Sequence, residues 1–354
     1  MDIYILDEKL NTVANYDFYK SIIWSNRYYK TGDFELIIPL VKDVKEKIRQ
    51  DYYIYRDRDY KDRIAERPKI IEKVELIENA GENSLLVSGR DVTALLERRV
   101  IYPTEILNGN YETCILNIIN NHAVSPQDTK RIIDIFEIEN TGLITDTIDA
   151  QVTGDSLLKY IEEVSADYKI GFRTDFSKDR KKFIFKIFKG VNRFESDSVV
   201  ISRKNNNLVK YDYINDKQNY KNMAIVAGSG EGTERKVVRL NDDLMGLDRR
   251  ELFVDAKDLS TTTSEGEIIP ESEYMEQLRQ RGSEKLSENK IDITNSCEID
   301  PDGMFKFNKD FFVGDEIMCR GYTDFRERIV ETTESDTATG VKTELTFEEV
   351  EEDG

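Results

Sequence analysis

The chain has 354 residues, of which 39% are hydrophobic and 10% aromatic, enough for two or three domains with packed cores. No run of about 18 apolar residues occurs, which excludes a membrane-spanning helix of the usual length. The chain begins MDIYILDEKL, without the basic region and apolar run of a secretory signal, so we expect synthesis in a cytoplasm.

The three cysteines, Cys114, Cys297 and Cys319, are widely spaced and form no CxxC pair. Their odd number and spacing argue against a disulfide framework and against a cysteine-based metal site. We expect them to be small buried residues, because free cysteine is among the most frequently buried residue types.

The formal net charge of −19 is concentrated towards one end of the chain. Residues 1–101 hold 18 Lys and Arg against 19 Asp and Glu, whereas residues 250–354 hold 12 against 28. So acidic a segment cannot hold a phosphate backbone through counterion release. Two interpretations stay open: a surface that keeps the protein soluble, or the lining of a passage through which a polyanion slides without binding.

The N-terminal part has the pattern of a β-domain. Its clearest stretch is Trp24–Leu40, WSNRYYKTGDFELIIPL, which contains the only tryptophan. Gly32 can take a positive φ between two apolar runs, so the stretch predicts a hairpin whose second strand stops at Pro39. Asp91 is expected to cap a short helix over 92–99. The other predicted elements are a helical turn within 41–50 and strands over 2–6, 12–16, 21–28, 34–39, 52–56, 69–78 and 85–88.

Pro103 marks a boundary, after which helices and strands alternate. Thr113 is expected to cap a helix over 114–121. Asp155 or Ser156 is expected to cap an amphipathic helix over 157–166. The predicted strands here are 132–138, 168–174 and 182–188. This mixture is typical of a separate α+β domain.

The remainder again has the pattern of β-structure, interrupted by one long helix. That helix is predicted over 271–288, with Pro270 at its first turn and Tyr274 and Leu278 among its apolar points. Gly282 weakens its middle by about 1 kcal/mol relative to alanine. The predicted strands are 208–214, 224–228, 236–240, 249–253, 291–297, 305–307, 316–319, 328–332 and 345–350.

These elements predict an α+β, mostly β fold with two small β-barrel domains, an inserted α+β domain and one long helix near 271–288. Four domains or segments are expected. They are an N-terminal barrel at 1–102, the inserted α+β domain at 103–197, a β segment linking or completing the barrels at 198–269, and the helix with an acidic C-terminal barrel at 270–354.

Two stretches resemble catalytic or nucleotide-binding motifs, and for both the structural interpretation is favoured. The glycine-rich loop 228–232 contains a glutamate and precedes a strand pattern, so we expect a hairpin loop rather than a phosphate cradle. Residues 154–157 spell the GDSL of a serine hydrolase family, which places its histidine well after this motif. The only histidine, His122, precedes it, so Asp155-Ser156 is expected to be a helix cap.

Metal and glycosidase chemistry have equally weak signals. His122 without a cysteine cluster does not predict a zinc site. Residues 300–303, DPDG, resemble a fragment of a calcium loop but lack the distal glutamate, so a turn is expected. Among 70 acidic residues no pair stands out for glycoside hydrolysis, which stays an open alternative. We therefore predict no catalytic, cofactor-binding or metal-binding residues, and a structural or assembly protein rather than an enzyme.

Several blocks, in order along nearly the whole chain, match one family. They are WSNRYYKTGDFELIIP at 24–39, IIEKV at 70–74, LVSGRD at 86–91, LLERR at 95–99, NMAIVAGSGEG at 222–232, GLDRRE at 246–251, VDA at 254–256, and 311–316 with Val313-Gly314-Asp315. Together they resemble siphovirus-type tail proteins, the tail or baseplate hub proteins of phages and phage-tail-like particles of low-GC Gram-positive bacteria.

The resemblance implies a homotrimeric hub ring at the distal end of a phage tail tube, in which two related barrels per subunit adapt a hexameric tube to a threefold tip. It implies a channel for the tape measure protein and for DNA, which passes without specific binding. Implied partners are the tail tube or distal tail protein and a tail tip or spike protein. The implied location is the virion tail, assembled in the host bacterial cytoplasm, and no cofactor is implied.

Three alternatives stay open beside the hub. One is a peptidoglycan- or glycan-degrading tail-associated enzyme, another is the hub of a phage-tail-like bacteriocin, and a third is a carbohydrate-binding adhesin. We expect no fused peptidoglycan hydrolase, because the chain ends at Gly354 and lacks the Cys–His pair of a cell-wall endopeptidase.

Overall fold

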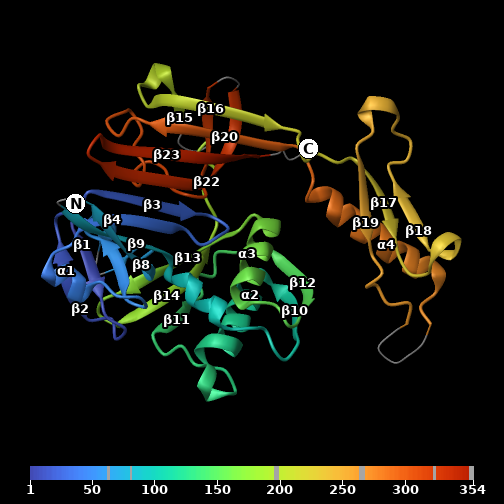
Figure 1. Ribbon diagram of the computed structural model, residues 1–354, viewed down its shortest axis with the longest axis horizontal. Helices are drawn as coiled ribbons and strands as arrows, with labels where there is room; N and C mark the ends of the chain where they lie inside the picture. Colours follow the sequence, from blue (N-terminus) through green and yellow to red (C-terminus); the bar gives the residue numbers. More distant parts are fainter. Residues whose placement is uncertain (62–63, 80–81, 195–198, 263–267, 322–323, 351–354) are drawn as a thin grey trace. The chain divides into compact units, whose positions relative to one another are not determined.

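Figure 1 shows the computed structural model, which describes residues 1–61, 64–79, 82–194, 199–262, 268–321 and 324–350. Contacts divide the chain into two compact units. Unit 1 consists of residues 1–211 and 296–354, and unit 2 of residues 212–295. The long helix therefore belongs to unit 2. The boundary expected at residue 270 grouped it with the C-terminal strands instead. The reason is that the strands it covers precede it in the chain.

Thirteen strands of the described residues form one large sheet. They are β1 Ile3–Leu6, β2 Thr12–Tyr16, β3 Ser21–Arg27, β4 Asp33–Pro39, β5 Tyr53–Arg56, β8 Lys69–Asn79, β9 Glu82–Asp91, β15 Val200–Ser202, β16 Leu208–Asp216, β20 Asp292–Ile299, β21 Glu316–Arg320, β22 Asp324–Thr337 and β23 Gly340–Glu349. Their order is β16-β20-β23-β22-β3-β4-β9-β8-β5-β1-β2, and β21 pairs with both β22 and β15.

Alternation of apolar and polar residues places one face of these strands in a core. In β4, Phe34, Leu36 and Ile38 are buried and the residues between them are more exposed, the period of two of a strand with one buried face. β3 pairs antiparallel with β4, with Trp24 opposite Phe34 and the two ring centroids 5.7 Å apart. The predicted hairpin is confirmed, and Pro39 is the last residue of its second strand.

The N-terminal and C-terminal strands are continuous, because β3 also pairs antiparallel with β22. Each side has its own apolar core: Trp24 and Leu36 belong to one, and Phe311 and Phe347 to the other. The mostly β, α+β class is confirmed. The strands predicted at 328–332 and 345–350 are parts of the much longer hairpin β22–β23. Residues 305–307 form no strand, only an isolated bridge between Phe307 and Phe311.

A second part of unit 1 mixes helices and short strands. Its elements are α2 Tyr111–Ile119, α3 Leu157–Tyr168, β6 Tyr60–Lys61, β7 Ile64–Ala65, β10 Glu105–Asn110, β11 Phe136–Glu139, β12 Thr147–Val152, β13 Gly171–Ser177 and β14 Lys182–Phe188. β10 pairs with β12, and the order β11-β14-β13-β7-β6 forms a five-stranded sheet. Two strands of that sheet, β6 and β7, come from before the boundary expected at residue 102.

The helix starts follow side-chain caps. α2 begins earlier than predicted, since Asn110 rather than Thr113 is its N-cap and accepts from the Thr113 N–H at 3.0 Å. Of the two residues predicted as the cap of α3, Asp155 and Ser156, Ser156 is the one that caps it. The shorter helices are α1 Lys42–Lys47, the 3₁₀ helices Asp57–Asp59, Val92–Arg98, Thr129–Arg131, Arg203–Asn205, Gly232–Glu234 and Gly246–Asp248, and the π-helix Asn120–Val124.

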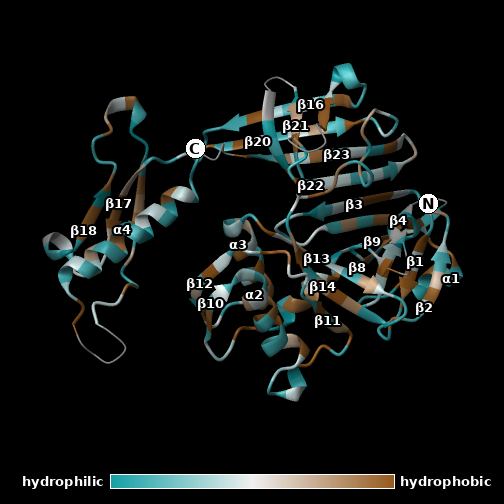
Figure 2. Cartoon of the chain, turned by 180° about the vertical axis from the view of Figure 1, so that it is seen from behind, coloured by the Kyte–Doolittle hydropathy of each residue, from teal (hydrophilic) through white to brown (hydrophobic). Residues whose placement is uncertain are grey.

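Unit 2 is a small sheet covered by one helix. Its elements are β17 Met223–Ala227, β18 Val237–Leu240, β19 Glu251–Asp255 and α4 Glu271–Ser287, with the sheet order β18-β17-β19. Pro270 is the N-cap of α4, and its carbonyl accepts from the Tyr274 N–H. α4 buries Tyr274, Leu278 and Gly282 on the sheet, while Figure 2 shows much of its length in hydrophilic colours. A Cβ on Gly282 would lie 2.4 Å from Leu240 Cδ1, so glycine permits the close approach of helix and sheet.

Of the helices that the structure describes, none is both long enough and apolar enough to cross a membrane. The longest, α4, has 17 residues and is charged over most of its surface, so burial against the sheet and not in lipid accounts for its apolar points.

Candidate functional site: a buried ionic junction in the large sheet

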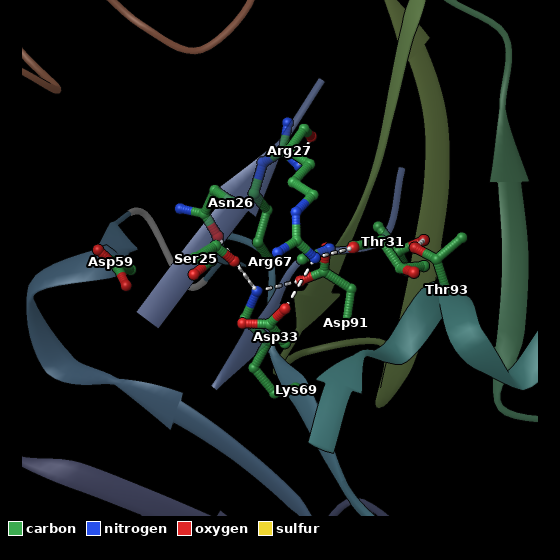
Figure 3. A network of polar contacts seen from close by, with 12 residues as sticks. Ser25, Asn26, Arg27, Thr31, Asp33, Asp59, Arg67, Lys69, Asp91 and Thr93 are labelled. Atoms are coloured by element: carbon green, nitrogen blue, oxygen red, sulfur yellow. Dashed lines mark hydrogen bonds and ion pairs between the residues drawn. The ribbon is translucent and has the colours of Figure 1, made fainter. Parts of the chain in front are cut away.

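A buried cation lies where the hairpin β3–β4 meets β8 and β9. The side chain of Lys69 is fully buried at the start of β8. Its Nζ donates to the carbonyl oxygen of Ser25 at 2.7 Å and to Asn26 Oδ1 at 3.2 Å, and it lies 2.5 Å from Asp91 Oδ1 (Figure 3). All three donors of the ammonium group are thereby used, which is what makes its burial tolerable.

Asp91 fixes the turn of the hairpin as well as the lysine. Its second carboxylate oxygen accepts from the Gly32 N–H at 2.6 Å. A Cβ on Gly32 would lie 2.0 Å from the Ser25 carbonyl oxygen, so close approach requires this glycine, and not the positive φ expected from the sequence. The expected capping role of Asp91 is also wrong: it makes no side-chain capping bond to residues 92–98, because Lys69 and Gly32 occupy its carboxylate.

The environment of the junction lowers the pKa of its buried lysine. Burial lowers the pKa of Lys69 to about 8, and the attraction of Asp91 offsets only part of this effect. The ring of Trp24, which is 1% exposed, lies beside this cation and beside a second one. Lys69 Nζ is 5.1 Å and the Arg56 guanidinium 4.6 Å from the ring centroid, both within cation–π range.

Arg56 links the far side of the N-terminal strands to the C-terminal ones. Its Nη2 donates to Glu334 Oε2 at 2.9 Å, and its Nε lies 2.5 Å from Asp59 Oδ2. Glu334 also pairs with Arg58. Burial alone would raise the pKa of Glu334, but Arg56 and Arg58 outweigh burial and hold it below its ordinary value.

Arg27, at the end of β3, completes the junction. Its Nε and Nη2 donate to the two carboxylate oxygens of Glu331 at 2.9 and 3.2 Å, a bidentate pair, and its Nη1 lies 2.7 Å from Asp33 Oδ2. Glu331 and Glu334 belong to the acidic C-terminal third. Part of that acidity is therefore neutralised by arginines of the N-terminal part, and these two residues are unavailable for an acidic channel lining.

The contacts of the junction require a strongly curled sheet. β8 lies three strand positions from β3, about 14 Å in a flat sheet, yet Lys69 reaches the backbone of Ser25. β5 lies five positions from β22, about 24 Å in a flat sheet, yet Arg56 and Glu334 form a hydrogen bond. The ionic side chains thus fasten strands that sheet order alone would keep apart. This arrangement supports a structural role, holding strands together, rather than the making or breaking of covalent bonds.

The residues that were considered for catalysis or ligand binding have structural roles in the fold. Ser156 of GDSL accepts a hydrogen bond at the start of α3. His122 is buried with Nε2 3.0 Å from Glu105 Oε1, and burial lowers its pKa. Residues 228–232 connect the antiparallel strands β17 and β18, as predicted. Asp300 accepts from the Gly303 N–H at 3.1 Å, which confirms the predicted turn.

Among the residues that the structure describes, no group of three or more His, Cys, Asp and Glu side chains is arranged to hold a metal ion. Cys297 and Cys319 are buried and Cys114 is half-buried, and all three are free thiols. Burial of the first two agrees with the expectation from the sequence.

Sequence reasoning identified the hairpin but none of the ionic partners. The Arg56–Glu334 and Arg27–Glu331 bonds join residues 278 and 304 positions apart, beyond any local pattern. One signal did exist. The blocks at 24–39 and 86–91, chosen for their resemblance, meet in the structure at Gly32 and Asp91, with Lys69 just before the block at 70–74.

Several solved structures have a fold similar to that of this chain. No curated protein matches the chain. The 43 kDa tail protein of prophage MuSo2 from Shewanella oneidensis aligns with a TM-score of 0.56 and 13% identity over 99% of this chain and 98% of that one. The tail protein from Neisseria meningitidis MC58 gives 0.54 and 13% over 98% and 96%. Prophage tail protein gp18 from Listeria monocytogenes EGD-e gives 0.50 and 11% over 99% and 96%.

These structural likenesses, at such low identities, show the fold. The family follows from the sequence: the model of the Siphovirus ReqiPepy6 Gp37-like proteins matches residues 2–347. This match confirms the resemblance to siphovirus tail proteins inferred from the blocks. Since it covers almost the entire chain, the protein belongs to the Siphovirus ReqiPepy6 Gp37-like family.

Proposed function

We propose that the protein is a baseplate hub that forms a homotrimeric ring at the distal end of the tail tube. The observation that carries this proposal is the presence of two β-cores in one chain, joined edge to edge through β3 and β22. Three subunits bring six such modules into a closed ring. Six modules match a hexameric tube on one side, while the trimer keeps threefold symmetry towards the tip.

Each core is the interior of one hub-type β-barrel in this proposal. The N-terminal barrel consists of β1–β5, β8 and β9, and the C-terminal barrel of β15, β16 and β20–β23. The junction supports the first assignment, because Lys69 and Arg56 reach across the curled sheet to β3 and β22. A curled sheet whose distant strands contact one another is the geometry that a small barrel needs.

The ring surrounds a channel that passes the tape measure protein and then DNA. A net charge of −19 supports this part of the proposal, since an acidic wall releases a polyanion rather than holding it. The channel lining excludes Glu331 and Glu334, which are engaged by arginines. The distal tail protein and the tube lie on one side of the ring and a tail tip or spike protein on the other. The hub is assembled in the host bacterial cytoplasm and remains in the virion tail.

The proposal is tested by the mass and symmetry of the purified full-length protein. Light scattering after size-exclusion chromatography is expected to give the mass of three chains, and negative-stain electron microscopy a ring with threefold symmetry. A second measurement uses tails from producing cells, in which antibody labelling is expected at the distal end. A monomer in solution together with label elsewhere in the particle would remove the hub proposal.

The hub acts without enzymatic activity in this proposal. The similar solved structures are tail proteins, and the two motifs considered for hydrolase chemistry form a helix cap and a hairpin loop. A zymogram on host peptidoglycan is expected to remain blank. A band that disappears when contaminating lysins are removed belongs to the contaminant. A band that persists in the lysin-free preparation would favour the hydrolase alternative.

A further inference from the structure

A cavity of about 210 Å³ lies next to the ionic junction, within unit 1. Four cationic side chains line it, Arg67, Arg173, Lys189 and Arg193, together with the aromatic rings of Phe188 and Phe312. Two of its lining residues, Asn26 and Asp59, belong to the junction described above. The carboxylates of Asp59, Glu66 and Asp315 also line the cavity, so an anionic ligand with an apolar stem can be held only by a cation that these carboxylates leave unpaired.

Arg67 has an unusual backbone and side chain. The residue is 7% exposed, and its φ of 48° lies in the left-handed region that non-glycine residues rarely adopt. Backbone strain of this kind persists only where the surroundings impose it, and it concentrates at ligand sites. The buried guanidinium lies at the wall of the cavity. Figure 3 shows Arg67 near Asn26 and the junction.

The guanidinium of Arg67 is only partly satisfied by the protein. Its Nη1 donates to the Arg27 carbonyl oxygen at 2.9 Å, and its plane lies over Phe188, 5.6 Å from the ring centroid. Within the described part of the chain, Nε and Nη2 donate no hydrogen bond, and the side chain forms no ion pair. The Nε–Nη2 edge is the one that makes two parallel hydrogen bonds to a carboxylate.

The other cations at the cavity have acidic partners. Arg193 pairs with Asp315, Arg173 Nε lies 3.2 Å from Asp175 Oδ2, and Lys189 Nζ lies 3.2 Å from Asp146 Oδ1. Of these four cations, Arg67 alone forms no ion pair in the described part of the chain. A phosphate dianion would be repelled more strongly than a single carboxylate by Asp59, Glu66 and Asp315, which also line the cavity.

We propose that this cavity binds one carboxylate on a short alkyl stem, held by the Nε–Nη2 edge of Arg67 with the stem against Phe188 and Phe312. The volume, about seven times the share of one liquid water molecule, accommodates a group of this size. The carboxylate is supplied either by a free small acid or by a glutamate side chain of another tail component. The proposal stands on the geometry of the cavity and does not depend on the hub assignment.

The test is calorimetric titration of the full-length protein at constant ionic strength with four probes. They are propionate, inorganic phosphate, and the blocked peptides Ala-Glu-Ala and Ala-Gln-Ala. Propionate and the glutamate peptide are expected to bind, and phosphate and the glutamine peptide to bind more weakly. Comparable affinities for propionate and the glutamate peptide indicate a free acid as the natural ligand, and much tighter binding of the peptide indicates a protein segment.

Variants assign the binding to the proposed edge. Arg67→Gln is expected to lower the affinity about tenfold or more, the value of a lost charge-assisted hydrogen bond. Arg67→Lys keeps the positive charge but lacks the planar guanidinium that makes two parallel hydrogen bonds. It replaces Arg67→Gln in the test if that variant fails to fold. Arg180→Gln, at an exposed arginine outside the cavity, is the matched control and leaves the affinity unchanged. Absence of binding by both carboxylate probes, or equal affinity in the Arg67 variants, would overturn the proposal.

Discussion

Replacing Trp24 with alanine removes the largest buried side chain of the N-terminal core. The indole packs on Phe34 and lies beneath two buried cations, Arg56 and Lys69. The substitution therefore leaves a cavity between β3 and β4 and takes away the aromatic face that both cations contact. The structure assigns this residue to packing within unit 1.

Two contributions set the size of the expected effect. Truncation of a buried aromatic residue to alanine costs about 3–5 kcal/mol in protein cores. Loss of the desolvated cation–π contacts adds about 1–2 kcal/mol. The expected loss of about 4–7 kcal/mol is comparable to the whole unfolding free energy of many domains. Trp24→Phe keeps a ring in the core and is expected to lose about 1–2 kcal/mol.

The assay is urea unfolding followed by far-ultraviolet circular dichroism, because Trp24 is the only tryptophan and its removal abolishes intrinsic tryptophan fluorescence. Two units need not unfold together, so Leu278→Ala, in the core of unit 2, identifies the transition that should stay unchanged in the Trp24 variants. Trp24→Ala within about 1 kcal/mol of wild type would refute the core assignment. If that variant were stable yet formed no rings, the residue would belong to a subunit interface.

Three further changes test other parts of the structure. Glu334→Gln leaves Arg56 buried with one charged partner fewer and is expected to destabilise unit 1 by about 3–5 kcal/mol in urea unfolding. The pKa of Lys69 is about 8 in the folded state and 10.5 ordinarily. Between these two pH values the folded state therefore binds fewer protons than the unfolded state. The unfolding free energy should rise with pH between pH 7.5 and 9.5, and Lys69→Met should flatten this rise. Gly282→Ala improves helix propensity, but its Cβ meets Leu240, so unit 2 should lose about 1–3 kcal/mol in thermal unfolding.

Each of these outcomes has a contrary result, and the first also has a matched control. For Glu334, the exposed pair Lys159–Glu163 supplies Glu163→Gln, which should change stability by less than about 1 kcal/mol. Equal effects of the two glutamine variants would contradict a buried junction. A wild-type slope with pH in Lys69→Met would place the titration elsewhere, and a gain in stability from Gly282→Ala would mean that α4 does not press on β18.

Local patterns were sufficient for much of the secondary structure. The alternation in β4, the cap at Ser156 and the apolar points of α4 each depend on residues within one or two turns or strands, and all are found in the structure. They were readable because burying one face sets a period of two or 3.6 in the sequence. In the part of the hairpin β22–β23 that was not predicted, buried positions such as Glu334 and Thr343 are polar, so the apolar alternation is missing there.

The family also followed from the sequence, since blocks in order along the chain do not require a structure to be compared. The roles of individual residues did not follow. Asp91 has the sequence context of a helix cap and Gly32 that of a positive-φ turn, yet a lysine and a backbone oxygen brought close by the curled sheet determine both. The grouping of α4 with strands of unit 2 was likewise decided by packing.

The hairpin Trp24–Leu40 therefore could be located from the sequence alone, because its alternation is local. The ionic junction around it could not, because its partners lie up to 304 positions away and are brought together only by the curvature of the sheet. Burial gives these charges their influence on stability, and burial exists only after the strands have assembled.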